Sequence, residues 1–452
     1  MEGEEMSQLR KVRRKILLFP LPLQGHVIPM FNLANILHSK GFSIILIHTR
    51  YNSPDPTHFP HLTFHFLEDG LPQNSRLTSN DLTTVLSAIQ SNCVQPLQDC
   101  LSQILSAAAT DQEPVACLIS DPMYSFAGSV AQSFNLPRMV LRTGGMSAFV
   151  LYDSLPMLRQ NGYFPLQVAK FDEPVPELPP LKVKDLPPEV QHGILATTVK
   201  ETKNSQGVIC NTLEELEDYA IATVQQSIPY PIFPIGPMHK YSQTSAASIL
   251  QPDHTSLSWL NTQPPKTVLY VSFGSIAVIS ETEFLEMAWG LANSRQPFLW
   301  VVRPGLSKDS ELSEMLPVGY SQIVGERGKI VKWAPQLEVL SHPAVGGFWT
   351  HCGWNSTVES ICEGVPMLCL PFFADQAINA RHICDNWKIG LRLEKKTREN
   401  IESAITKLMA DGDSAEMRIR ITAFKEKAKL CLQKDGSSYE SLERLTNYLT
   451  SL

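Results

Sequence analysis

The feature that most restricts the fold of this chain is a repeated alternation of short buried strands and helical segments. Strand-forming apolar runs occupy residues 16–19 and 42–48. Between them, apolar residues from Val27 to Leu37 recur at helical spacing, and Gly41 is placed to end that helix. Alternation of this kind is typical of parallel sheets whose strands are joined by covering helices. We therefore expect an α/β protein.

The alternation occurs in two series. Further strands of the first series are predicted at residues 115–120, 138–141 and 207–211. The segment around residues 236–257 is polar and has no periodicity, as expected of a linker. Strands of the second series are predicted at residues 267–273, 298–302, 329–332, 345–349 and 367–370. The sequence thus predicts a first domain at 1–237, a linker at 238–257 and a second domain at 258–436.

Bulk composition excludes several functions. The formal net charge of -7 over 452 residues gives no electrostatic support to nucleic-acid binding. Nine cysteines without a CxxC pair favour reduced thiols over a disulfide framework or a zinc site. The basic residues before the apolar run at 16–23 lack a following cleavage pattern, and no apolar stretch is long enough to span a membrane. We therefore expect a cytoplasmic protein.

The richest segment in chemical groups runs from Trp333 to Gln376. It reads WAPQLEVLSHPAVGGFWTHCGWNSTVESICEGVPMLCLPFFADQ. It combines ring, amide, hydroxyl and carboxylate side chains with a glycine-flanked helix start. A nucleotide-sugar needs this mixture: a ring to stack on the base, a carboxylate for ribose, donors for the diphosphate and acceptors for sugar hydroxyls.

This segment resembles the signature box of the plant UDP-glycosyltransferases over its whole length. LPLQGHVIPMFNLA, VLYVSFGSIA, FLWVVRPG and GSSYESLERL elsewhere in the chain resemble the same family. The resemblance is closest to the family-76 branch, whose members act on small hydroxylated acids and diterpenoid glycosides. It implies the GT-B fold, with two facing Rossmann-like domains and the active site in the cleft between them. It also implies that the terminal helix, 437–452, packs back on the first domain. Ser437 and Glu440 have the spacing of a capping box for that helix.

The predicted catalytic pair is His26 and Asp121. Each follows a predicted strand, where α/β folds expose functional side chains. A histidine can accept a proton from a hydroxyl nucleophile, and a carboxylate can orient the ring. Taken alone, His26 could be a turn or helix-capping residue, and Asp121 could cap a helix starting near Tyr124. The resemblance assigns His26 as the base and Asp121 as its partner.

The resemblance also assigns the donor site. Trp333 and Ala334 would hold uracil, although Trp333 could instead be a core residue of an edge strand. Gln336 and Glu359 are expected at the ribose hydroxyls, but Ser356 and Glu359 also have the spacing of a capping box. The residues expected at the phosphates are Ser275, His351, Asn355 and Ser356. The residues expected at the hexose are Trp354, Asp375 and Gln376, and the terminal glutamine favours glucose. Asp375 could merely cap the next helix.

The acceptor site is expected mainly in the first domain. The predicted wall residues are Met123, Thr143, Met146, Phe149 and, from the second domain, Phe373. Apolar residues at such places are also common in protein cores. Residues 92–100 and 174–180 resemble the small-acid members of the branch. This resemblance favours small hydroxylated or carboxylic acceptors, with flavonoid or terpenoid alcohols as alternatives.

The resemblance implies an inverting transferase that uses UDP-glucose and no metal. We expect it to act as a monomer on a small molecule. An epimerase or hydrolase would need further acid/base groups near the sugar. A non-catalytic UDP-sugar sensor would have no use for both His26 and Asp121.

Overall fold

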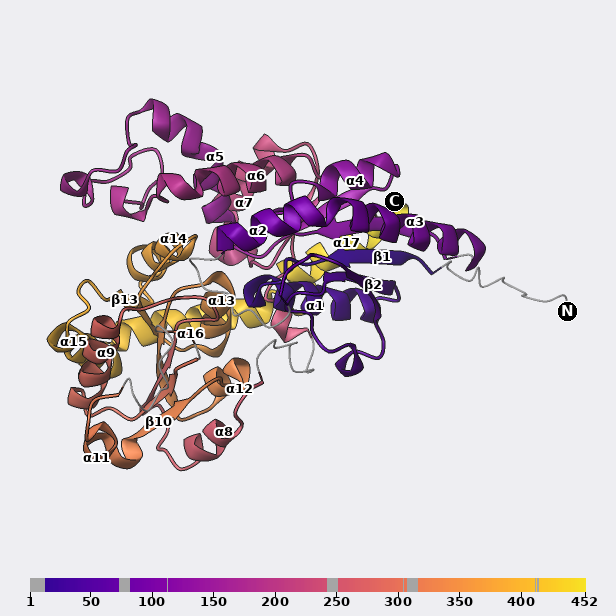
Figure 1. Cartoon of the computed structure of the whole chain (residues 1–452). Helices are drawn as coiled ribbons and strands as arrows, with labels where there is room; N and C mark the ends of the chain where they lie inside the picture. The colour runs from indigo at the N-terminus through magenta and orange to yellow at the C-terminus, as the bar shows by residue number, and fades with distance from the viewer. Residues whose placement is uncertain are drawn as a thin grey trace, which may run out of the picture.

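Two parallel β-sheets organise the chain in the computed structural model, which describes residues 13–72, 82–111, 113–241, 251–303, 305–306, 316–410, 412 and 414–452. Each sheet forms the centre of one domain, and the two domains face each other (Figure 1). Within the described residues, neighbouring strands of both sheets pair in parallel, as the alternating sequence pattern predicts.

The first sheet has the strand order β3-β2-β1-β4-β5-β6-β7 in the described part of the chain. Its strands are β1 (Lys15–Phe19), β2 (Ser43–Thr49), β3 (Thr63–Leu67), β4 (Val115–Ser120), β5 (Arg138–Arg142), β6 (Val208–Cys210) and β7 (Ile232–Pro234). The strand order reverses at β1, which pairs with both β2 and β4. Loops that leave the carboxyl ends of such strands diverge and form a crevice.

The second sheet has the order β10-β9-β8-β11-β12-β13 and reverses in the same way at β8. Its strands are β8 (Val268–Ser272), β9 (Phe298–Val301), β10 (Gly328–Val331), β11 (Val345–Thr350), β12 (Met367–Cys369) and β13 (Gly390–Arg392). The strands β8, β9 and β11 are buried along their whole length. Burial on both faces explains why they appear in the sequence as continuous apolar runs.

Helices cover both sheets. Those of the first half are α1 (Gln24–Ser39), α2 (Leu82–Asn92), α3 (Val94–Asp111), α4 (Ala127–Ser133), α5 (Met146–Gln160), α6 (His192–Lys203) and α7 (Glu214–Ser227). Those of the second half are α8 (Thr255–Leu260), α9 (Glu281–Asn293), α11 (Tyr320–Val324), α12 (Gln336–Ser341), α13 (Trp354–Glu363), α14 (Gln376–Arg381), α15 (Arg398–Met409), α16 (Ala415–Leu430) and α17 (Ser437–Ser451). Among the described helices, none is long and apolar enough to cross a membrane.

Several expectations from the sequence need correction. The strands β3, β7 and β13 were not predicted, because they are short or carry polar residues that hide the strand pattern. The linker prediction, 238–257, lies partly outside the described residues, and its last part belongs to α8. The capping box at α17 does not form. Gly436 is the N-cap residue, and the Ser437 hydroxyl donates instead to Glu215 at 2.7 Å.

The C-terminal helix α17 packs on the first sheet although its sequence follows the second domain. The side chains of Leu442, Leu445 and Leu449 join the core formed by β1, α1 and β4. Figure 1 shows the yellow end of the chain running from α16 in the second domain to α17 among the elements of the first. The Ser438 hydroxyl donates to Gly236 O at 2.5 Å, so this second crossing lies beside the end of the first domain.

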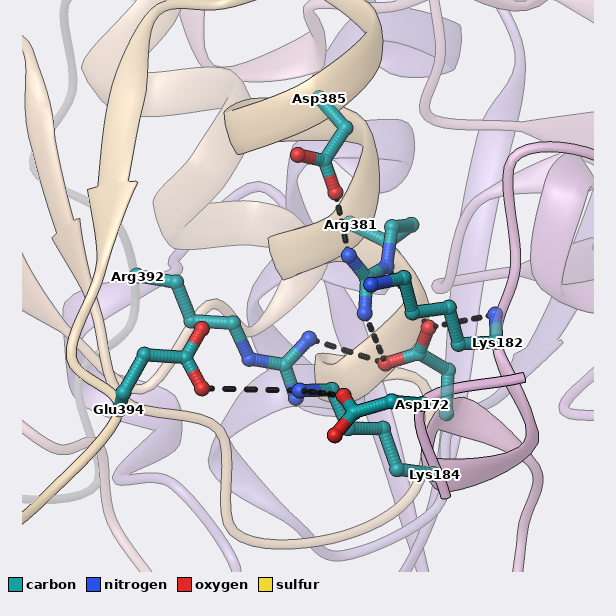
Figure 2. A network of polar contacts seen from close by, with 8 residues as sticks. Asp172, Lys182, Lys184, Arg381, Asp385, Arg392 and Glu394 are labelled. Carbon is teal, nitrogen blue, oxygen red and sulfur yellow. Dashed lines mark hydrogen bonds and ion pairs between the residues drawn. The ribbon is translucent and has the colours of Figure 1, made fainter. Parts of the chain in front are cut away.

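A buried ion cluster joins the two domains at the end of β13 (Figure 2). Asp185 accepts from Arg381 Nε at 2.7 Å and from Arg392 Nη1 at 2.9 Å. Asp185 is buried, as is Arg381, so neither charge is screened by bulk water. At the rim, Lys184 reaches Asp172 at 2.9 Å and Glu394 at 3.5 Å.

Candidate active site

All the predicted site residues except Met146 and Phe149 line a cavity between the domains. It has a volume of about 930 Å³ and is lined from both halves of the chain. From the first domain come the loops after β1, β4 and β5; from the second come the loops after β8, β10, β11 and β12. These are the carboxyl ends of the strands, where the reversals of strand order predict a ligand crevice. The volume suits a nucleotide-sized ligand with a small second substrate.

His26 and Asp121 form a hydrogen-bonded pair on the cavity wall. His26 lies in the first turn of α1, and Asp121 directly follows β4. The distance from His26 Nδ1 to Asp121 Oδ2 is 2.6 Å, and the aspartate side chain is 1% exposed. The hydroxyl of Thr143 lies 3.2 Å from the same imidazole nitrogen. Because the carboxylate accepts a hydrogen bond from Nδ1–H, Nε2 is left without a proton as the basic nitrogen.

The alternative that Asp121 caps a helix is not realised. The helix α4 begins at Ala127, and its N-cap residue is Phe126. Asp121 Oδ1 instead accepts from the backbone N–H of Met123 at 2.9 Å. With one oxygen on the loop and the other on His26, the carboxylate is held in a fixed orientation toward the imidazole.

A second polar group surrounds Glu359 on α13. The amide nitrogen of Gln336 donates to Glu359 Oε2 at 2.7 Å and lies 2.9 Å from the Ser356 hydroxyl. The phenol of Tyr270 donates to the amide oxygen of Gln336 at 3.2 Å. Burial raises the pKa of Glu359 to about 7, against the opposing effects of the Gln336 hydrogen bond and of Lys240. Trp333 and Ala334 line the cavity beside this group, and Trp333 is partly buried after the end of β10.

The capping-box alternative for Ser356 and Glu359 is also not realised. The helix α13 begins at Trp354 with Gly353 as its N-cap residue and no side-chain cap. Ser356 therefore lies inside the first turn, and Glu359 points to Gln336 instead of back to its own helix terminus. A carboxylate and an amide are held together at the cavity wall. They can accept hydrogen bonds from the hydroxyls of a ligand, and the amide can also donate one.

Two glycines make room for His351 at the end of β11. A Cβ atom at Gly274 would lie 2.7 Å from His351 Nε2, and one at Gly353 would lie 2.5 Å from it. Gly274 also has a φ of +72°, which favours glycine. Burial lowers the pKa of His351 to about 4, so the ring is neutral at pH 7 and can donate a hydrogen bond without a positive charge.

An anion would also find donors beside His351. Ser275 lines the cavity from the loop after β8. The start of α13 has no side-chain cap, so its backbone N–H groups and the helix dipole favour a negative group there. The residues on the two facing loops thus fit a diphosphate.

Two residues expected at the donor contact the first domain directly. The indole N–H of Trp354 donates to Asn211 O at 2.8 Å. The amide nitrogen of Asn355 donates to Gly25 O at 2.8 Å, and its oxygen accepts from Asn211 at 3.2 Å. Gly25 is the neighbour of His26, so Asn355 ties the start of α13 to the loop that carries the imidazole. Both residues line the cavity and also fix the relation between the domains.

Asp375 and Gln376 lie where α14 begins. Asp375 is the N-cap residue by position, but its side chain makes no capping hydrogen bond. Its Oδ2 lies close to the first domain. A Cβ atom added at Gly144 would be only 3.0 Å from this oxygen. Burial raises the pKa of Asp375. The amide oxygen of Gln376 accepts from the backbone N–H of Phe372 at 2.8 Å, which shapes this loop. Both side chains line the cavity.

The predicted acceptor residues divide into two groups. Met123, Thr143 and Phe373 line the cavity. Met146 and Phe149 do not belong to its lining and are fully buried in the core beneath α5, so the prediction for these two is wrong. The first turns of α5 present Ala148 and Tyr152 to the cavity instead. Sequence reasoning missed the face of α5 because the helix is apolar on several sides.

The helix α6 also contributes to this end of the cavity and was not predicted as part of the site. Its contributions are Ile194, Leu195 and Thr198. The only signal for them was a weak helical periodicity in a segment without a recognisable motif.

Comparisons with known proteins agree with this site. Residues 56–425 match the family model described as UDP-glucoronosyl and UDP-glucosyl transferase. The chain is 48% identical to UDP-glycosyltransferase 76B1 of Arabidopsis thaliana, covering 98% of this chain and 100% of that protein. It is 44% identical to UDP-glycosyltransferase 76G1 of Stevia rebaudiana, with 100% of both chains covered.

Solved structures extend the similarity to the fold. Phytolacca americana UGT2, complexed with UDP-2-fluoro-glucose and pterostilbene, superposes with a TM-score of 0.81 at 28% identity, over 97% of this chain and 100% of that one. A UDP-glucose:anthocyanidin 3-O-glucosyltransferase in complex with UDP gives a TM-score of 0.83 at 26% identity, over 98% of this chain and 100% of that one.

The two facing domains and the cavity between them define a glycosyltransferase of the GT-B fold. The chain belongs to the plant UDP-glycosyltransferases, and its similarity to members of family 76 extends over nearly its whole length.

Proposed function

We propose that this enzyme transfers glucose from UDP-glucose to a hydroxyl or carboxyl group of a small plant metabolite, with inversion at the anomeric carbon. The observation that carries the proposal is the 2.6 Å bond between His26 Nδ1 and Asp121, which leaves Nε2 as a base on the cavity wall. That wall faces the loops of the second domain that suit a nucleotide-sugar.

In the proposed reaction, His26 Nε2 takes the proton of the acceptor oxygen as that oxygen attacks C1 of glucose. The bond between C1 and the phosphate oxygen breaks on the opposite face, and UDP leaves with the bonding electrons. Asp121 stabilises the imidazolium that forms. The neutral His351, Ser275 and the start of α13 stabilise the charge that develops on the diphosphate.

The proposed donor contacts follow from the same geometry. Trp333 stacks on uracil with Ala334 beside it, and Gln336 with Glu359 binds the ribose hydroxyls. Asn355 and Ser356 complete the diphosphate site. The proposed hexose ligands are Trp354, Asp375 and Gln376. The UDP-2-fluoro-glucose in the Phytolacca americana structure supports glucose as the sugar. All nine cysteines are free thiols, which supports a cytoplasmic location.

The test is a screen of hydroxylated acceptors with UDP-glucose, in which mass spectrometry detects the addition of one hexosyl group. His26→Ala should abolish transfer and leave UDP affinity nearly unchanged, because the imidazole lies outside the proposed nucleotide contacts. His38→Ala, at the far end of the same helix, is the matched control and should retain activity. Normal turnover by His26→Ala would overturn the mechanism, and UDP binding without transfer to any acceptor would favour a sensor.

A further inference from the structure

Two buried arginines on β5 differ in how their charges are satisfied. Arg138 and Arg142 are 5% and 4% exposed, and alternation along a strand places them on the same face. Arg138 donates to Ser120 Oγ at 3.2 Å and to Glu201 O at 2.7 Å, and it pairs with the Glu201 carboxylate at 3.1 Å.

Arg142 has no such partners. Within the part of the chain that the structure describes, its guanidinium forms no hydrogen bond or ion pair, and its Nε is fully buried without an acceptor. Its guanidinium carbon lies 4.9 Å from the centroid of the Phe149 ring, in a cation–π contact. A cation–π contact compensates only part of the cost of burying a cation.

The surrounding charges leave this cation available to a ligand. Burial lowers the pKa of Arg142, and Cys210, Tyr152, Asp121 and Asp375 counteract this effect through space. An arginine nonetheless stays protonated at neutral pH. The carboxylate of Asp121 already binds His26 and the Met123 N–H. Asp375 lies beyond ion-pair distance and belongs to the proposed hexose contacts. A buried donor set of this kind calls for an anion that the protein itself does not supply.

Arg142 lines the cavity at the end that the acceptor would occupy. It precedes Thr143, whose hydroxyl contacts His26, and the nearby wall is formed by Ala148 and Tyr152 of α5 and Leu195 of α6. The residues proposed for the diphosphate follow strands of the second sheet instead. A guanidinium beside these wall residues matches a planar carboxylate, which it can bind through two parallel hydrogen bonds.

We propose that Arg142 binds the carboxylate of an acidic acceptor while a hydroxyl of the same molecule reaches His26. The enzyme would thus select small hydroxylated carboxylic acids over their neutral analogues. This inference rests on the proposed glucosyl transfer and adds the residue that would select an acidic acceptor. A site built to bind a charged group strongly disfavours an analogue that lacks it, because the buried cation is then left unpaired.

The test compares the three hydroxybenzoic acids with the corresponding hydroxybenzamides as acceptors of glucose from UDP-glucose. For wild type, kcat/KM should be at least about tenfold higher for the best acid than for its amide. Arg142→Gln should lower kcat/KM for the acid by roughly 10- to 100-fold and change the value for the amide by less than about threefold. Arg142→Lys should retain part of the preference because it keeps the charge and loses the planar fork.

Two further measurements separate binding from folding and from catalysis. Calorimetry should give the same UDP affinity for wild type and Arg142→Gln. Benzoate, which has no hydroxyl, should bind wild type in the presence of UDP and bind Arg142→Gln at least about tenfold more weakly. Equal losses with acid and amide, or unchanged benzoate binding, would overturn the role of Arg142. Transfer to neutral phenols with no preference for acids would overturn the acceptor class and leave the glucosyltransferase proposal intact. Failure of transfer to every acceptor would instead reject the proposed function.

Discussion

We predict that the ionised carboxylate of Glu359 lowers the free energy of unfolding of the ligand-free enzyme. The same ionised form is the one that should bind UDP best. The Glu359 carboxylate lies at the wall of the cavity, is 7% exposed and accepts a hydrogen bond from Gln336. Because burial raises the pKa of Glu359 to about 7, the folded protein binds a proton that the unfolded chain has already lost above its ordinary value of 4.5. Glu359→Gln keeps the shape and the acceptor oxygen and removes the ionisation.

The sign and size follow from linkage. Between the two pKa values the native state holds more protons than the unfolded state, so wild-type stability falls as the pH rises through this interval and levels off above it. The rise in the pKa of Glu359 from 4.5 to about 7 corresponds to a loss of about 3 kcal/mol in the free energy of unfolding at most. We therefore expect Glu359→Gln to be more stable than wild type by about 2–3 kcal/mol at pH 8, and the difference to shrink toward pH 5.

The assay is urea unfolding of the ligand-free protein at several pH values between about 5 and 9, with Glu416→Gln on the exposed side of α16 as a control. Calorimetry at pH 8 should also show that Glu359→Gln binds UDP at least about tenfold more weakly, because a charge-assisted hydrogen bond to ribose is lost. A stability difference between wild type and Glu359→Gln that does not vary with pH would refute the reasoning.

Trp333→Ala should weaken UDP binding at least about tenfold in calorimetry, because the stacked ring is lost; unchanged affinity would reject the stacking role. Asp121→Asn should lower kcat by about 100-fold or more with little change in UDP affinity, because an amide no longer fixes the proton on His26 Nδ1; kinetics with wild-type turnover would contradict this. Asp185→Ala should destabilise the fold by about 3–5 kcal/mol in urea unfolding, because it removes the only carboxylate partner of Arg392 among the described residues and leaves the buried Arg381 with the more exposed Asp385 alone. Asp172→Ala, at the exposed rim of the same cluster, should change the urea midpoint far less, and equal losses would argue against a buried cluster.

The fold could be predicted where the sequence pattern is strong. Long buried strands such as β1, β4 and β11 are continuous apolar runs, and the residues at their carboxyl ends could be placed correctly. The strands β3, β7 and β13 escaped prediction because they complete the sheet edges, where tertiary pairing decides the conformation of a short segment.

The candidate site was predictable in its loops and less so in its helices. His26 and Asp121 lie far apart in sequence, and two strand ends bring them together. The predicted wall residues Met146 and Phe149 are in the core because a helix has only one face toward the cavity, and composition did not reveal which. The ion cluster at Asp185 depends on the packing of two domains, which no local pattern records.

The chain returns to the first domain beside the residue at which that domain ends, and this arrangement should affect how the cleft opens. The Cys431 thiol, just after α16, and the Ser438 hydroxyl, in the first turn of α17, both contact Gly236 O. Contacts at this point should restrict sliding of one domain over the other and favour rotation about this part of the chain. Substrate entry would then require the Asn355–Gly25 bond to separate, which couples access to the pocket with the position of the base.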